Sequence, residues 1–167
     1  MSKVIDQASG DNWSIYHGDC VDVAKGLPDR SVACSVFSPP FASLYTYSNS
    51  PRDMGNVKND AEFFAHFGFL IDELARVMMR GRVVAMHCMD MPTSKERDGH
   101  IGLRDFPGEI IRAFEKRGFI FHSRVTIWKD PVTAMQRTKA LGLLHKTVRE
   151  NASMSRVGIP DYIVAMR

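Results

Sequence analysis

Ser31-Val32-Ala33-Cys34-Ser35-Val36-Phe37-Ser38-Pro39-Pro40-Phe41 is the stretch of sequence that decides the fold. Its first seven residues are small, apolar or β-branched, which predicts a buried strand over residues 31–37. Two prolines then stop the strand, because a proline has no N–H to donate to a sheet ladder. In open α/β sheets, ligands bind at the carboxyl ends of the strands. The polar Ser38 and the aromatic Phe41 therefore lie where a binding site is expected.

The segments around this loop alternate between strands and helices. Trp13-Ser14-Ile15-Tyr16 has the alternation of a strand and runs into His17-Gly18-Asp19-Cys20. Apolar residues at helical spacing then predict a short helix over residues 21–27. With the strand over residues 31–37 this makes a βαβ unit, in which the two strands are expected to be parallel.

The rest of the chain continues the same alternation. Asp60–Arg80 is the clearest amphipathic helix, and Gly81 is expected to end it. Polar loops are expected at 42–59 and 92–105, strands at 83–87, 119–128 and 162–166, a helix at 106–117, and a helix from Asp130-Pro131 towards Arg149. This pattern predicts an α/β fold with a Rossmann-like, doubly wound sheet, mostly parallel with an antiparallel part among the later strands.

The composition is that of an ordinary single domain. The chain has 167 residues, is 44% apolar and has a net charge of +3, which permits nucleic-acid binding without requiring it. No apolar run is long enough to span a bilayer and no signal segment opens the chain, so we expect a cytoplasmic protein. The three distant cysteines predict reduced, buried thiols rather than disulfides or a zinc site. The histidines have no ligand spacing, so no metal site is assigned and His87 is expected to be a core histidine.

The proline loop suits chemistry at the exocyclic amine of an aromatic base. The lone pair of such an amine is delocalised into the ring, so the nitrogen is a poor nucleophile. Acceptors placed around the amino hydrogens draw the nitrogen towards a tetrahedral, nucleophilic state. Ser38 and the Pro39 carbonyl supply two acceptors, and the Phe41 ring can stack on a base that has been extracted from a duplex.

Ser38-Pro39-Pro40-Phe41 resembles the catalytic tetrapeptide of amino-group DNA methyltransferases, which read (Asp/Asn/Ser)-Pro-Pro-(Tyr/Phe/Trp). Further segments match the family in the same order, and the last of them is similar to phage- or prophage-borne members: Tyr16-His17-Gly18-Asp19-Cys20, Leu27-Pro28-Asp29-Arg30-Ser31-Val32, Ile127-Trp128-Lys129, and the span from Asp130 to Tyr162. The resemblance covers nearly the whole chain.

The resemblance implies S-adenosylmethionine-dependent methylation of a flipped base in double-stranded DNA. Ser38, Pro39, Pro40 and Phe41 would form the catalytic loop, and Asp19 and Ser38 would contact the cofactor. A serine in the first position is more similar to cytosine-N(4) enzymes than to adenine-N(6) enzymes. Tyr45 would either line the base pocket or lack order without DNA. The late basic residues would either contact phosphates or form a solvated helix face: Lys129, Arg137, Lys139, Lys146 and Arg149.

One family feature is missing from the sequence. The family has a glycine-rich cofactor loop of the form Phe-x-Gly-x-Gly, and residues 1–167 contain none. In the circular order that puts the catalytic motif first, this loop comes later. We therefore expect residues 1–167 to be one domain, the catalytic part of such an enzyme, which ends before the loop. A second chain or a carboxyl-terminal half would supply it. The alternatives are a non-catalytic DNA-binding or interaction module derived from the family, and a methyltransferase acting on RNA or a small molecule.

Overall fold

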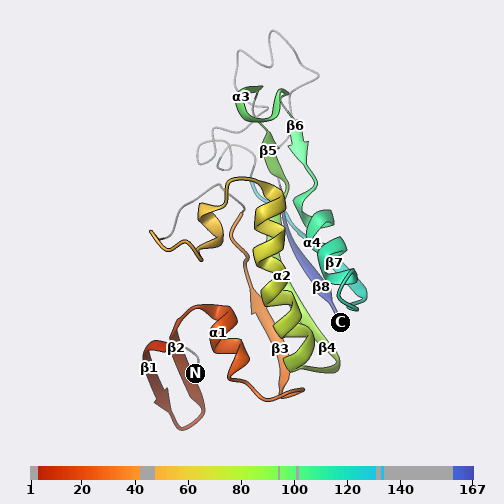
Figure 1. Cartoon of the computed structure of the whole chain (residues 1–167). Helices are drawn as coiled ribbons and strands as arrows, with labels where there is room; N and C mark the ends of the chain where they lie inside the picture. The colour runs from red at the N-terminus through yellow and green to blue at the C-terminus, as the bar shows by residue number, and fades with distance from the viewer. Residues whose placement is uncertain (1–3, 42–47, 94, 101, 131–132, 134–159) are drawn as a thin grey trace.

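A computed structural model describes residues 4–41, 48–93, 95–100, 102–130, 133 and 160–167 of the chain (Figure 1). The elements follow one another in this order: β1 (Val4–Gly10), β2 (Trp13–Gly18), α1 (Cys20–Lys25), β3 (Val32–Phe37), the 3-10 helix η2 (Met54–Asn56), α2 (Asp60–Val77), β4 (Met78–Met89), β5 (Met91–Thr93), α3 (Lys95–Asp98), β6 (Gly102–Arg104), α4 (Phe106–Glu115), β7 (Phe121–Ile127) and β8 (Asp161–Met166).

Four strands form the central sheet in the order β3-β4-β8-β7. β3 and β4 are parallel, whereas β8 is antiparallel to β4, and β7 is antiparallel to β8. The predicted α/β class and the predicted antiparallel part are confirmed. Within the described residues, β3 is an edge strand, because β4 is its one hydrogen-bonded neighbour in the sheet.

The core lies between this sheet and the helices α2 and α4, which cover one of its faces (Figure 1). Phe63 and Phe67 of α2 and Phe106 and Phe114 of α4 are fully buried, as is Met86 of β4. Burial of each such side chain contributes roughly 1.5–3 kcal/mol. The helices therefore fix the positions of β4 and of the loops that follow the strands.

Side-chain caps fix where both long helices begin. Asn59 Oδ1 accepts a hydrogen bond from the Glu62 N–H at 2.9 Å at the start of α2. Asp105 Oδ1 accepts one from the Gly108 N–H at 2.8 Å at the start of α4. Such caps contribute about 1 kcal/mol each, since they satisfy N–H groups that have no partner within the helix.

The boundary between α2 and β4 differs from the prediction. The helix ends at Val77, and the strand begins at Met78 rather than at Val83. Gly81 has a φ of +70° and lies inside β4, where the pairing with β3 shifts register. A glycine suits a strand irregularity as well as a helix end, because both use left-handed backbone.

The expected parallel pairing of residues 13–18 with residues 31–37 is wrong for the described sheets. β2 pairs antiparallel with β1, a strand that the sequence reading missed because Val4–Gly10 is mostly polar. The turn between the two strands lies at Asp11 and Asn12. The β1–β2 hairpin and the four-stranded sheet are thus separate, with α1 between them (Figure 1).

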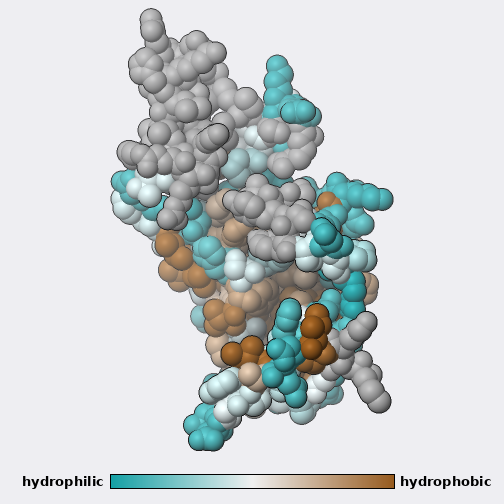
Figure 2. Space-filling view, turned by 90° about the vertical axis from the view of Figure 1, so that its left-hand side faces the viewer, coloured by the Kyte–Doolittle hydropathy of each residue, from teal (hydrophilic) through white to brown (hydrophobic). Residues whose placement is uncertain are grey.

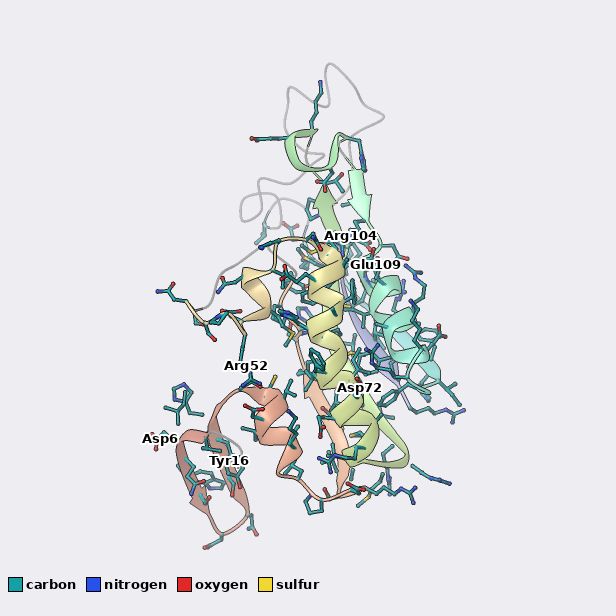
Figure 3. All side chains as sticks on the ribbon, in the orientation of Figure 1. Asp6, Tyr16, Arg52, Asp72, Arg104 and Glu109 are labelled. Carbon is teal, nitrogen blue, oxygen red and sulfur yellow. The ribbon has the colours of Figure 1, made fainter. Side chains whose placement is uncertain are left out.

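Residues 92–105, expected to be a loop, include the short hairpin of β5 and β6 and the helix α3. Arg104 at the end of β6 ties this hairpin to both long helices. Its guanidinium bonds Glu109 of α4 at 2.6 Å and also pairs with Asp60 of α2 (Figure 3).

Arg76 of α2 holds α1 in place. Its guanidinium donates to the carbonyl oxygens of Ala24 and Leu27, each at 2.9 Å, and to Asp29 at 2.6 Å and Glu73 at 2.7 Å. The carbonyls at the end of α1 have no partners within the helix, so a forked donor is well suited to them.

The remaining predicted elements are confirmed with small shifts, namely β2, α1, β3, α4, β7 and β8. Asp130 also forms the expected cap, because its Oδ1 accepts from the Thr133 N–H at 2.8 Å. Of the helix expected to follow, only Thr133 lies within the described residues. The three cysteines are unpaired, but only Cys88 is buried, whereas Cys20 and Cys34 are exposed, so the expectation of three buried thiols is wrong.

Candidate functional site

The proline loop leaves β3 at the carboxyl edge of its parallel pair with β4. Ser38 is exposed directly after the strand, Pro39 is buried, and Phe41 is half-buried. The Phe41 ring contacts the edge of Phe106, with centroids 6.4 Å apart, and lies 6.2 Å from the ring of His87. The loop is therefore anchored to the core at Pro39 and Phe41 and presents the Ser38 hydroxyl at the surface.

Ser38 is the first member of a line of polar side chains that crosses the sheet. Its Oγ donates to the His87 carbonyl oxygen at 3.1 Å and lies 3.4 Å from His87 Nδ1. His87 Nε2 lies 3.1 Å from Asp161 Oδ2, and Lys129 Nζ donates to Asp161 Oδ1 at 2.7 Å. We call Ser38, His87, Asp161 and Lys129 the polar row.

Each strand of the central sheet contributes one residue to the polar row, in spatial order. Ser38 follows β3, His87 lies in β4, Asp161 begins β8, and Lys129 lies just beyond β7. Because side chains alternate along a strand, His87 points away from the face where Met86 and Cys88 are buried under the helices. The row therefore lies on the opposite face of the sheet.

Asp19 lies at the end of β2 and caps α1. Its Oδ1 accepts from the backbone N–H groups of Val21 and Asp22 at 3.0 and 3.1 Å. Its Oδ2 lies 3.2 Å from Nε of Arg52, which also bonds Asp22 at 2.7 Å (Figure 3). The hydrogen bond from Arg52 is the main cause that holds the pKa of Asp22 below its ordinary value. The carboxylate of Asp19 is thus fixed in orientation by its own helix and by Arg52.

The predicted site residues fall into three groups. Ser38, Pro39, Pro40 and Phe41 form one loop, and Lys129 is joined to Ser38 through His87 and Asp161. Asp19 belongs to the separate hairpin-and-helix unit. The other residues proposed to contact DNA lie outside the described residues: Tyr45, Arg137, Lys139, Lys146 and Arg149.

Sequence reasoning missed His87 and Asp161 as parts of the site. His87 was expected to be a core histidine, yet its side chain is 38% exposed and makes two polar contacts, to Ser38 and to Asp161. The alternation of side chains along β4 could have indicated the exposure of His87, since its neighbours Met86 and Cys88 are buried on the other face. The contact with Asp161 joins residues 74 positions apart, which no local pattern reveals.

The environment on the helix-covered face of the same strand ends is different. Burial raises the pKa of the Cys88 thiol to about 12. Burial, and next the Asp90 carboxylate 3.4 Å from its hydroxyl, raises the pKa of Tyr162. The Arg124 guanidinium lies 5.3 Å from the centre of the Tyr162 ring. The Cys88 thiol and the Tyr162 hydroxyl are therefore both held in their neutral forms.

A cavity lies at the other end of β4, lined among others by Arg80, Arg82, Arg117 and Arg167. His87 lies seven positions after Arg80 along β4, which is about 23 Å along a strand. This cavity is not part of the site at Ser38. Across the described residues, no group of three or more His, Cys, Asp or Glu side chains could hold a metal ion. No helix there has the length and apolar character needed to cross a membrane.

Comparison with known proteins identifies the fold. No family model and no curated protein sequence matches the chain. Among solved structures, it is similar to a protein of Thermus thermophilus described as a DNA modification methylase and complexed with S-adenosyl-L-methionine, with a TM-score of 0.63, 20% identity, and coverage of 90% of this chain and 51% of that one.

Two further solved structures have the same likeness. PvuII DNA methyltransferase, which is cytosine-N4-specific, gives a TM-score of 0.61 at 14% identity over 92% of this chain and 48% of that one. A SAM-dependent methyltransferase from Archaeoglobus fulgidus gives 0.50 at 13% identity over 90% and 65%. The chain thus has the Rossmann-like fold of methyltransferases. It spans about half the length of the DNA methylase structures it matches.

Proposed function

We propose that this chain is the catalytic part of an S-adenosylmethionine-dependent DNA methyltransferase that methylates the exocyclic amine of a flipped base. The observation that carries this is the position of Ser38-Pro39-Pro40-Phe41 at the carboxyl end of a parallel strand in a methyltransferase fold. There the Ser38 hydroxyl is exposed, and the loop behind it is anchored by Pro39 and Phe41.

In the proposed reaction, the residues of this chain hold the base. Ser38 Oγ and the Pro39 carbonyl accept the two amino hydrogens, and the Phe41 ring stacks on the base. The amine nitrogen, drawn towards tetrahedral geometry, then attacks a methyl group in line. S-adenosylmethionine supplies that methyl as a sulfonium, so the carbon–sulfur bond breaks towards sulfur without a covalent enzyme intermediate. The proton that the nitrogen loses passes to solvent.

The experiment is methyl transfer to double-stranded DNA, with the modified nucleosides identified by mass spectrometry. We expect N4-methylcytosine rather than N6-methyladenine, because the motif begins with serine and a cytosine-N4-specific enzyme shares the fold. Ser38→Ala should lower kcat by about 10²-fold, the usual loss for one transition-state hydrogen bond. An RNA or small-molecule acceptor that outcompetes duplex DNA would overturn the proposed substrate.

We assign the cofactor contacts of this chain to Asp19 and Ser38. Asp19 follows a strand end and is held rigidly by Arg52 and by the first turn of α1. Titration calorimetry with S-adenosylmethionine tests the assignment, with this chain joined to a segment that carries the glycine-rich cofactor loop. Asp19→Ala should abolish the heat of binding, whereas Asp29→Ala, at the other end of α1, should leave it unchanged.

Contacts with DNA phosphates are proposed for the late basic residues. Lys129 lies beside the site, although its charge is paired with Asp161. Arg137, Lys139, Lys146 and Arg149 continue the basic character along the chain. Phosphate contacts by these residues would make the affinity for DNA fall steeply with salt. A salt-independent affinity would instead favour the solvated helix face.

We also propose that the site is completed by a further polypeptide segment of methyltransferase type, which carries a glycine-rich cofactor loop. The free edge of β3 and the face beside it support this. Val36 is 75% exposed and Cys34 is exposed as well, in a strand that pairs on one side among the described residues. Figure 2 looks onto this side and shows exposed hydrophobic side chains, in brown. A doubly wound sheet continues past such an edge.

The completing segment is tested by adding it. The chain is assayed alone, fused to downstream sequence from the same gene, and mixed with a candidate second chain that contains Phe-x-Gly-x-Gly. We expect cofactor binding and methyl transfer only in a completed form. DNA binding without methyl transfer in every form would instead favour the non-catalytic module, which the missing glycine-rich loop also supports.

A further inference from the structure

The polar row contains an arrangement that bears on how Ser38 acts. A serine hydroxyl can donate or accept hydrogen bonds, whereas a carboxylate accepts only. To draw an amine towards tetrahedral geometry, the group in this position must accept from the amino hydrogens. A serine therefore serves the proposed reaction only if its own proton points elsewhere.

Two contacts of Ser38 provide that other direction. Its Oγ reaches the His87 carbonyl oxygen at 3.1 Å and His87 Nδ1 at 3.4 Å. The carbonyl oxygen is an acceptor in every state. The Nδ1 atom is an acceptor only in the tautomer of the neutral ring that carries its hydrogen on Nε2.

Asp161 selects this tautomer. Its Oδ2 lies 3.1 Å from His87 Nε2, and a carboxylate oxygen in that place favours a hydrogen on Nε2. Lys129 donates to the second oxygen of Asp161 at 2.7 Å, which holds the carboxylate in one orientation. Asp161 is only 17% exposed, so water screens the contact little.

From these contacts we propose that His87 is a positioning residue for Ser38. Because Asp161 holds the His87 ring, both atoms beside the Ser38 hydroxyl, the His87 carbonyl oxygen and His87 Nδ1, are acceptors. Ser38 therefore turns its proton towards His87 and its lone pairs towards the substrate amine. Ser38 then acts as an acceptor in the way that an aspartate would. The inference rests on the proposed function for its substrate, but the orientation of Ser38 and His87 can be measured without it.

The first test is nitrogen NMR of the His87 ring in the purified chain, well above the ordinary histidine pKa of about 6.5. We expect the hydrogen on Nε2. Asp161→Asn places an amide donor opposite Nε2 and should move the hydrogen to Nδ1, a tautomer reversal of the kind that such a substitution causes in hydrolase triads. Asp72→Asn is the matched control, since Asp72 lies on α2 (Figure 3) and pairs with Arg117, which follows α4. A hydrogen on Nδ1 in the unsubstituted chain overturns the proposal.

The second test uses the completed enzyme. Asp161→Asn should lower kcat about 10²-fold with little change in KM for DNA, because orientation rather than binding is lost. In a Ser38→Asp background the same change should have less than about a twofold effect, since a carboxylate accepts whatever the tautomer. An equal loss in both backgrounds would mean a merely structural role for Asp161. If the NMR result holds but no completed form methylates DNA, the proposed function fails and the orientation of Ser38 stands.

Discussion

At the scale of single residues, Phe41 connects the proline loop to the core. One part of its ring packs on Phe106 and His87, and the half-buried ring leaves another part for a base. Phe41→Ala should therefore raise KM for DNA about ten- to hundredfold, because stacking contributes roughly 1–3 kcal/mol per base. Phe41→Trp should keep KM within a few-fold. Steady-state methylation kinetics measure both, and a normal KM for Phe41→Ala with a lowered melting temperature would make the ring structural only.

Cys88 should react with thiol reagents much more slowly than Cys20 and Cys34. Burial raises the pKa of the Cys88 thiol to about 12. At about pH 8 almost all Cys88 side chains are therefore protonated thiols, and very few are the nucleophilic thiolate. Cys20 and Cys34 are exposed. We expect two thiols to react with Ellman's reagent in the folded chain and the third only after unfolding. Cys88→Ser should leave the number of fast thiols unchanged, and a loss of one would contradict the assignment.

At this scale the sequence pattern indicates the proline loop as a candidate site but not the residues that contact Ser38. Ser38, Pro39 and Phe41 stand together in the chain, so a local pattern identifies them. His87 and Asp161 come together because of the register between β4 and β8, which places Ile163 opposite His87 and Asp161 opposite Met89. Such pairing between distant strands is a property of the sheet and leaves no mark in either segment alone.

At the scale of elements, one side chain carries the attachment of α1. Arg76→Met keeps an unbranched apolar stem but removes the guanidinium that donates to Ala24, Leu27 and Asp29. We expect a loss of about 1–3 kcal/mol in the free energy of unfolding, measured by urea titration, since two part-buried carbonyl oxygens each lose a charged donor. Arg112→Met on α4 is the control, because its contact with Asp105 is long at 3.8 Å and exposed. An equal loss of unfolding free energy in both variants would show that the Arg76 contacts stabilise the fold no more than the exposed Arg112–Asp105 pair does.

The elements that the sequence predicted well are those with one strong local cause. The amphipathic faces of α2 and α4, with their caps, fixed both starting residues. The failures have causes outside the segment. β1 is a strand because β2 pairs with it, and Val4–Gly10 alone is too polar to show this. Gly81 lies within β4 rather than at the predicted helix end, and the irregularity there depends on the pairing with β3, which the local sequence does not reveal.

At the scale of the whole molecule, the open face beside β3 should respond when the domain is completed. Val36→Lys places a charge on a side chain that is 75% exposed, so the isolated chain should lose less than about 0.5 kcal/mol. Covering that face would bury the charge, so the variant should fail to form the completed enzyme. Co-purification measures assembly, and Cys34 should become protected from thiol reagents in the assembled wild-type chain.

Thr126→Lys provides the control for this experiment, since Thr126 is exposed on β7 at the other edge of the sheet. It should assemble normally. Normal assembly of Val36→Lys, or a Cys34 thiol that stays reactive in the assembled form, would mean that the completing segment docks elsewhere.

The edge strand β3 has a further consequence for the aggregation and degradation of the protein in a cell. This strand contains no proline and no charged residue: Val32-Ala33-Cys34-Ser35-Val36-Phe37. Natural sheet edges commonly carry such residues, which prevent pairing with strands of other protein molecules. On the proposal that a further segment covers this edge, a copy without that segment would be open to aggregation and to removal by chaperones and proteases. Its abundance would then follow the supply of that segment, and orphaned copies would be short-lived.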